Sequence, residues 1–293
     1  MRRFPVAAKT LRDYRAAFIS IAFVLFAIAL LDLLIYPSYK DSLEDFELPA
    51  GFEGFIGESP LSSPEGFIAA EFFAWIPLLL IVVAVIAGTG IIAGEEAAGT
   101  MDLLLAQPVS RRRLLLERFG GAALGLLAAA LAGLPGFALG MLLVDFDLGF
   151  GRIIAATVNM VPVTLLFLAF SIWMSSALAN RTQASIVSIG LVVAAYFLNL
   201  IGASADVLEW PRKLSPFYWA DGSRVLVDGF DYARAGGLLA VAALFVLLAL
   251  RSFEQRDIAS SAGEWRLSSL LLRFVRRTRE EAHTEPPAHP AEY

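Results

Sequence analysis

The chain has 293 residues, of which 58% are hydrophobic and 17% charged, with a formal net charge of −5. A soluble domain of this length carries about 45–50% apolar and about 25% charged residues, so the composition argues against a soluble globular protein. There is no cysteine, and the two histidines, His283 and His289, both lie in the polar C-terminal stretch. Disulfides and thiolate metal sites are therefore excluded, and a histidine-based metal or acid–base site is not expected.

Six apolar runs are each long enough to cross a bilayer, which requires about 20 residues of helix. The sequence therefore predicts an all-α membrane protein with six transmembrane helices, at residues 16–36, 66–93, 114–144, 153–179, 184–203 and 233–250. The first run exceeds the roughly 7–15 apolar residues of a cleavable signal peptide, so it is interpreted as the first span. Residues 1–15 precede the six-helix domain (16–250), and residues 251–293 form a tail whose end is predicted to be disordered.

The basic residues gather on one side of these spans. If the N-terminus is cytoplasmic, seventeen of the 23 Lys and Arg fall in cytoplasmic segments. This bias predicts that both termini are cytoplasmic, because basic loops remain inside. The Arg clusters fall at span ends and not on one soluble face, so nucleic acid is not expected as a partner.

Two outer loops have distinct compositions. The loop between the first two spans is acidic, which indicates either a solvated loop or a vestibule that collects cations. The last outer loop, 204–232, is rich in aromatic residues, which settle at the membrane–water boundary. We expect it to be re-entrant or interfacial, and its aromatic residues are Trp210, Phe217, Tyr218, Trp219, Phe230 and Tyr232.

Proline and small residues recur inside the spans. Pro77, Pro135 and Pro162 predict kinks, which would either open an outward-facing cavity or gate or simply serve packing. Small residues at four-residue spacing predict close helix approach, either within the chain or at a subunit interface. The pairs at this spacing are Gly90 with Gly94, Gly121 with Gly125, Gly136 with Gly140 and Ser171 with Ser175.

Charge near the centre of the spans is sparse. Asp32 and Glu71 lie close to the outer ends of the first two spans, and the more central polar residues are neutral. Ion-coupled carriers place a charged residue near the membrane midplane, so this pattern disfavours a secondary carrier. A membrane enzyme is also disfavoured, because no set of polar residues converges at one depth.

The link between the second and third spans, within 94–119, carries the most informative pattern. It begins with acidic residues at Glu95 and Glu96, continues through a leucine-rich stretch, and turns at Pro108. Ser110 is placed to cap the next helix. The sequence thus predicts an acidic and apolar cytoplasmic helix, followed by an Arg triplet at 111–113. Membrane anchors prefer basic residues on their polar face, so this helix suits a protein partner better than a lipid surface.

This link resembles the signature of type-2 ABC transporter permeases, which are membrane subunits of exporters whose ATPase is a separate polypeptide. The family pattern is an acidic residue, a Gly-Thr pair, a leucine-rich turn, and Pro-Val-Ser-Arg leading into the third span. Residues that match it in order are Glu96, Gly99, Thr100, Leu103, Leu104, Pro108, Val109, Ser110 and Arg111. Residues 9–15 also resemble the family's interfacial N-terminal helix, and 214–219 resemble its last outer loop.

The resemblance implies a mechanism. Two permease chains, identical or different, would pair with two ABC ATPase subunits in a prokaryotic plasma membrane, and 94–113 would hold a coupling helix seated in an ATPase groove. The sequence lacks the phosphate-binding G-x-x-x-x-G-K-[ST] pattern, so ATP and Mg would be bound by the partner, and no cofactor is expected in this chain. Glu95 and Glu96 would pair with basic groups of the ATPase or be solvated. Arg111–Arg113 would contact lipid head groups or the ATPase.

Three alternatives to an exporter subunit remain open, namely a secondary carrier, a membrane enzyme, and a scaffold that anchors an ATPase without transport. The substrate is not encoded in any recognisable motif. The hydrophobic, weakly charged spans favour an amphiphile taken from the bilayer over a small ion. Export is favoured over import, because nothing in the chain suggests docking of an external binding protein.

Overall fold

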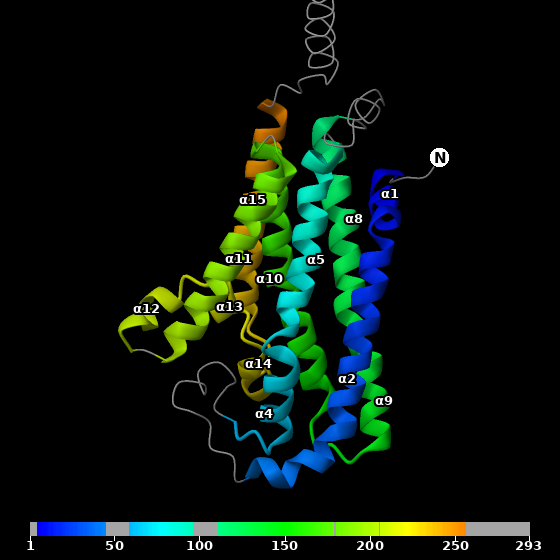
Figure 1. Ribbon diagram of the computed structural model, residues 1–293, viewed down its shortest axis with the longest axis vertical. Helices are drawn as coiled ribbons and strands as arrows, with labels where there is room; N and C mark the ends of the chain where they lie inside the picture. The colour runs from blue at the N-terminus through cyan, green and yellow to red at the C-terminus, as the bar shows by residue number, and fades with distance from the viewer. Residues whose placement is uncertain (1–4, 45–58, 96–109, 179, 205, 256–293) are drawn as a thin grey trace, which may run out of the picture. The chain divides into compact units, whose positions relative to one another are not determined.

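The computed structural model describes residues 5–44, 59–95, 110–178, 180–204 and 206–255 (Figure 1). These residues form helices and no strand, and six helical stretches are long and apolar enough to cross a membrane. The prediction of an all-α protein with six spans is confirmed, whereas the cytoplasmic location of the termini stays a prediction. The six stretches are Arg15–Leu43, Pro64–Gly94, Arg111–Leu143, Phe150–Ala177, Arg181–Ala203 and Tyr232–Gln255.

The N-terminal region forms two helices. Helix α1 (Pro5–Asp13) is the predicted N-terminal helix, and Tyr14 separates it from α2 (Arg15–Glu44). Helix α2 continues well past residue 36, where the apolar run ends, and passes through Pro37. The length of the apolar run sets the membrane-spanning part, but the helix itself can continue into a polar environment, because its backbone hydrogen bonds are internal.

The second span consists of four segments. Helix α4 (Pro64–Ile68) passes into the π-helix η1 (Ala69–Phe73), and after a break α5 (Ile76–Thr89) is followed by the π-helix η2 (Gly90–Gly94). Pro77 lies in the first turn of α5, directly after the break. Its ring has no N–H to donate, which is tolerated at a helix start, so the predicted kink is realised as a break between two helices.

The third span is also divided, into α8 (Arg111–Leu131) and α9 (Gly133–Leu143). The division lies at Ala132, three residues before Pro135, and the proline removes one backbone hydrogen bond and crowds the carbonyl of Leu131. Helix α10 (Phe150–Ala177), in contrast, continues through Pro162 as one helix. Two of the three predicted prolines therefore coincide with breaks, and the third does not interrupt its helix.

The fifth span, α11 (Arg181–Ser204), leads into the aromatic loop, which folds into short helices. These are η3 (Asp206–Leu208), α12 (Glu209–Arg212), α13 (Pro216–Trp219) and α14 (Gly222–Asp228), before α15 (Tyr232–Gln255) forms the sixth span. Helix α14 turns back against α10 and η1, and buries Val225 and Leu226 there. Exposed Trp210 and Tyr232 fit a position at the membrane boundary.

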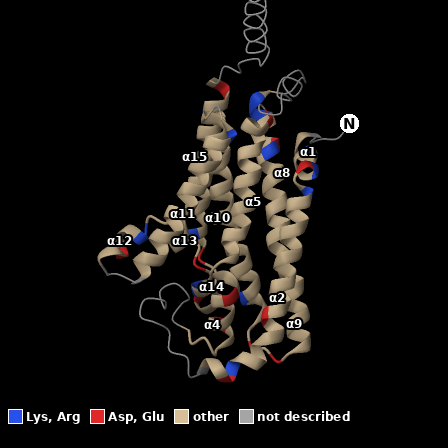
Figure 2. Ribbon diagram, in the orientation of Figure 1, with Lys and Arg blue, Asp and Glu red and all other residues tan. Residues whose placement is uncertain are grey.

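Helices α5 and α10 form the interior of the bundle. Helix α10 contacts α5, α8, α11, α14 and α15, and most of its apolar stretch is buried, as is most of the second span. The first, fifth and sixth spans keep broad exposed apolar faces, as expected for helices that face lipid or another subunit. Figure 2 shows that the long helices carry their charged residues mainly near their ends.

The small residues at four-residue spacing serve packing within the chain. A methyl group at Gly121 would lie 2.7 Å from the carbonyl oxygen of Ala7 in α1. Gly125 lies against the Phe18 ring of α2, and Gly136 against the α2 backbone at Phe26. Glycine is needed at these positions because two backbones approach each other closely. The intrachain alternative is therefore confirmed for these glycines.

Candidate functional site

The predicted site lies at the end of the bundle formed by α1, the start of α8 and the end of α15, here called the basic end (Figure 1). Glu95 directly follows the second span, Ser110 caps α8 and Arg111 is the first residue of that helix. The Ser110 side chain accepts the Arg113 N–H at 3.3 Å, as its capping role predicts. The remaining predicted residues fall outside the described part of the chain, and these are Glu96, Gly99, Thr100, Leu103, Leu104, Pro108 and Val109.

Glu95 is engaged by two basic residues of its own chain. Its Oε1 accepts a hydrogen bond from Arg118 Nη2 at 2.6 Å and another from Lys9 Nζ at 3.0 Å. The Arg118 side chain is 2% exposed and that of Glu95 is 13% exposed. An ion pair this well buried is strongly coupled, because little water screens it. The Glu95 carboxylate thus links α1, the end of the second span and α8.

A second carboxylate fastens α1 to α8. Glu117 Oε2 accepts the backbone N–H of Val6 at 3.1 Å, and Glu117 Oε1 accepts from Arg113 Nε at 2.7 Å. Val6 lies in the first turn of α1, where backbone N–H groups lack partners within the helix. A negative charge at this position is favourable, because the helix dipole places partial positive charge at the N-terminus. Helix α1 is therefore held by a buried charge as well as by packing.

Tyr14, at the junction of α1 and α2, completes the site. Its hydroxyl lies directly against Gly90 of η2, so that a side chain at Gly90 would collide with it. Burial raises the pKa of the Tyr14 hydroxyl above its ordinary value, so the ring remains neutral. The Arg181 side chain at the start of α11 lies beside Gly94, where an added methyl group would make only an ordinary van der Waals contact with it, at 3.6 Å. Gly90 of the π-helical turn η2 thus lets the junction of α1 and α2 approach the second span closely.

The Arg triplet was predicted to contact either lipid head groups or an ATPase, but each of its members has a partner within the chain. Arg111 Nη1 donates to the Phe253 carbonyl at 3.1 Å, and its guanidinium lies 5.7 Å from the centre of the Phe253 ring. Arg112 forms an ion pair with Glu254, and Arg113 pairs with Glu117. The contacts of Arg111 and Arg112 join the start of α8 to the end of α15. Arg112 and Arg113 are also largely exposed, so lipid or ATPase contacts remain compatible with their positions.

Sequence reasoning missed Glu117 and Arg118 as site residues. Both lie within the first turns of the third apolar run, where a charged side chain is costly unless it is paired. Their presence at the start of an apolar run was the available signal. It could not name their partners, because Glu95 and Val6 are distant in sequence and meet them only through the packing of α1 and η2 on α8.

Comparison with known proteins shows the family of the chain. Residues 5–258, which include every helix described above, match the family described as "ABC-2 family transporter protein". The chain belongs to this ABC-2 family. With six apolar helices, it is a multi-pass membrane protein, which in a prokaryote places it in the plasma membrane.

One curated relative is the probable ABC transporter permease protein NosY of Pseudomonas aeruginosa. The two sequences are 30% identical over 183 residues, which cover 56% of this chain and 64% of the relative. The match thus spans somewhat less than two thirds of the length of that relative.

Proposed function

We propose that this ABC-2 protein is the permease subunit of an ATP-driven exporter whose ATPase is a separate chain. The observation that carries the proposal is the family match, because it spans residues 5–258 and therefore the whole six-helix domain. The similarity to a probable ABC transporter permease supports it. Two permease chains, identical or different, would assemble with two ATPase subunits, which bind ATP and Mg.

The ion pairs at the basic end support a role for 94–113 as the coupling segment. Glu95, near the start of this segment, forms a buried ion pair with Arg118 of α8, which lies just after its end. Lys9 joins the same carboxylate to α1. A force that an ATPase applies to residues 96–109 would therefore act on α1, α5 and α8 together, because packed elements joined by buried ion pairs move as a unit and do not deform continuously.

We infer that the two neighbouring glutamates have different roles. Glu95 joins helices of its own chain, because its carboxylate accepts hydrogen bonds from Arg118 of α8 and Lys9 of α1. Glu96 is then the acidic residue that pairs with a basic group of the ATPase. This division refines the sequence-based hypothesis, in which both glutamates had the same role.

The experiment is co-purification of the full chain with candidate ATPases, followed by measurement of ATP hydrolysis. We expect Glu96→Lys to abolish association, because a like charge would face the basic ATPase groove. The matched comparison is Glu95→Gln, which keeps a hydrogen-bond acceptor for Arg118. It is expected to leave association intact and to alter only the coupling of hydrolysis to transport.

If no ATPase associates with the native chain, the permease assignment fails and a secondary carrier must be reconsidered. If Glu96→Lys associates and hydrolyses ATP like the native chain, Glu96 is not a docking residue. If the complex hydrolyses ATP but no amphiphile changes the rate, the chain is a scaffold for the ATPase and not a transporter subunit.

A further inference from the structure

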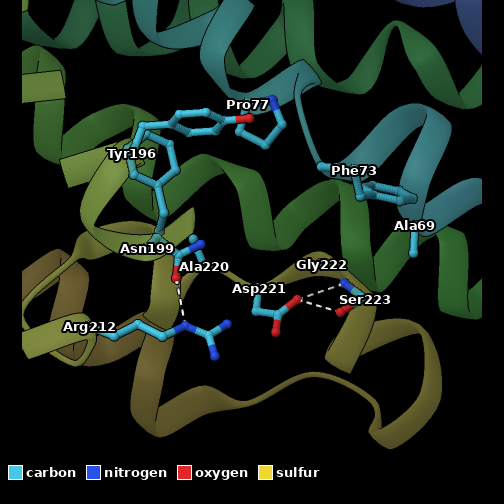
Figure 3. Close-up of a pocket in the computed structure, with 12 residues that line it drawn as sticks. Ala69, Phe73, Pro77, Tyr196, Asn199, Arg212, Ala220, Asp221, Gly222 and Ser223 are labelled. Atoms are coloured by element: carbon cyan, nitrogen blue, oxygen red, sulfur yellow. Dashed lines mark hydrogen bonds between the residues drawn. The ribbon is translucent and has the colours of Figure 1, made fainter. Parts of the chain in front are cut away.

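A pocket lies away from the basic end, between η1, α11 and the short helices α12–α14 (Figures 1 and 3). It is a shallow depression open to the outside, and the space of about 480 Å³ along its walls includes open solvent. Its apolar wall includes Phe73 from η1, Pro77 from α5 and Phe217 from α13. Since these residues come from the second span and the last outer loop, the pocket forms only when the loop folds back onto the bundle.

The polar side of the pocket is built around Arg212. Arg212 Nε donates to Asn199 Oδ1 at 3.1 Å, and its guanidinium lies 5.3 Å from the centre of the Tyr218 ring. Asn199 is only 8% exposed, so its amide holds the guanidinium from a fixed position. Gly202 allows this arrangement, because a methyl group there would lie 2.7 Å from Arg212 Cβ. The hydrogen bond to Asn199 and the ring of Tyr218 thus both orient the cation.

An acidic residue lies on the same lining. Asp221 caps α14, where its Oδ1 accepts the Ser223 N–H at 3.0 Å and the Ser223 hydroxyl at 2.6 Å. Figure 3 shows the Arg212 guanidinium directed toward the side of the pocket that holds Asp221. The pocket therefore presents a positive group and a negative group beside an apolar wall. A guanidinium suits phosphate or carboxylate, whereas a carboxylate suits ammonium or hydroxyl groups.

The position of the pocket along the bundle also indicates the kind of ligand. Asn199 lies in the last turns of the fifth span, and the loop that closes the pocket carries the exposed aromatics Trp210 and Trp219. Aromatic side chains of this kind mark the membrane–water boundary. A pocket with one apolar wall and two charged groups at that level fits a molecule with its head group in the boundary region and its chain in the bilayer.

We propose that this pocket binds the head group of a zwitterionic amphiphile, with its acidic group on Arg212, its ammonium or hydroxyl group on Asp221 and its chain along Phe73 and Pro77. The proposal rests on the proposed transport function only in naming this amphiphile as the cargo. Binding itself is a property of the chain alone. Binding can therefore be tested without an ATPase, and its result can be interpreted even if the permease assignment fails.

The test titrates the purified full chain, in micelles of an uncharged maltoside detergent, with lysophosphatidylethanolamine, and measures binding by native mass spectrometry and tryptophan fluorescence. We expect saturable binding that weakens about tenfold in Arg212→Gln, because a charge-assisted hydrogen bond is lost. The matched control is Lys213→Gln, which removes the adjacent positive charge. Lys213 is exposed and pairs with Glu209, so its loss is expected to leave binding unchanged.

Two further variants separate the roles of the charged groups. Arg212→Lys keeps the charge but loses the planar fork, and we expect binding between that of the native chain and that of Arg212→Gln. Asp221→Asn keeps a residue able to cap α14 but removes the negative charge. It is expected to shift preference from lysophosphatidylethanolamine toward lysophosphatidylglycerol, whose head group carries no ammonium. Unfolding temperatures of all variants show whether each protein is folded.

Several results would overturn the proposal. One is the absence of saturable binding to the native chain, and another is an equal loss of binding in Arg212→Gln and Lys213→Gln, which indicates general surface attraction. Free phosphoethanolamine that binds as tightly as the lipid would show that the pocket takes a soluble ligand. If the lipid binds but does not change the ATPase activity of the assembled complex, the amphiphile is not the transported cargo.

Discussion

Arg118 and Glu95 form a buried ion pair, with 2.6 Å between Nη2 and Oε1, across the segment of chain that separates the second span from the third. The pair closes the base of the proposed coupling segment, so the two flanks of that segment are held together by the chain itself. Lys9 of α1 shares the same carboxylate oxygen. Helix α1 is therefore joined to the same carboxylate as α8.

Replacement of Arg118 by Met is expected to lower the free energy of unfolding by about 3–5 kcal/mol, because it leaves the Glu95 carboxylate with too little charge compensation. Thermal unfolding in detergent, followed by tryptophan fluorescence, measures the effect. The double variant Arg118→Met with Glu95→Gln is expected to lose less than the sum of the single changes, since the two residues interact directly. Strictly additive losses would contradict the pairing.

Two adjacent glycines of α8 allow a controlled test of how α1 docks. Gly121→Ala would place a methyl group 2.7 Å from the Ala7 carbonyl oxygen, so α1 must shift away, and its amide hydrogens should exchange faster. Gly120→Ala meets no atom within 4 Å and is expected to stabilise the helix by about 1 kcal/mol. Hydrogen exchange with mass spectrometry distinguishes them. Equal exchange of α1 in both variants would show that α1 does not pack closely at Gly121.

The two contacts between α8 and α15 are expected to differ in strength. The Arg112 side chain is 70% exposed, so Arg112→Gln should leave the unfolding temperature unchanged, as for most surface ion pairs. Arg111→Gln should lower it, because Arg111 holds both the carbonyl and the ring of Phe253, whose side chain is fully buried. The same unfolding assay ranks the variants. A larger effect from Arg112 than from Arg111 would reverse this assignment.

Asp32 of α2 is expected to reduce stability. It is 7% exposed, and within the described part of the chain its Oδ2 has no hydrogen-bond partner. An unsatisfied buried polar group costs about 1–3 kcal/mol, so Asp32→Asn or Asp32→Leu should raise the unfolding temperature. Leu33→Ala, at the next position, should lower it by about 2–5 kcal/mol, because Leu33 is fully buried. If both Asp32 variants were destabilised, the carboxylate would have a stabilising partner.

The spans were predictable because each follows from a local property of the chain. A run of apolar residues must leave water, and its length fixes whether it can cross a bilayer, so the ranges predicted for the spans agree with the helices within a few residues at most ends. Helix α2 is the exception, since polar residues after 36 continue the helix without belonging to the apolar run. The Ser110 cap was predictable for the same reason, because it joins residues only three positions apart.

The contacts of the candidate site were not predictable in the same way. The sequence pointed to Glu95 and the Arg triplet as charged residues beside a recognisable motif, but it could not show that their partners are Arg118, Lys9, Phe253 and Glu254. Each pairing joins residues from different helices. Which charges meet depends on how α1, α8 and α15 rotate and pack, and a linear pattern does not contain that information.

The sequence by itself thus determined the six spans and the resemblance to ABC-2 permeases, because hydrophobicity and motif spacing act over short stretches of chain. The tertiary structure alone decided that Glu95 is tied within its own chain, and that Arg212, Asn199 and Asp221 line one pocket. The physical reason is that burial and pairing of charges are properties of a packed assembly. A charge that sequence reasoning assigns to solvent or to a partner is satisfied inside the chain when another helix brings the opposite charge to it.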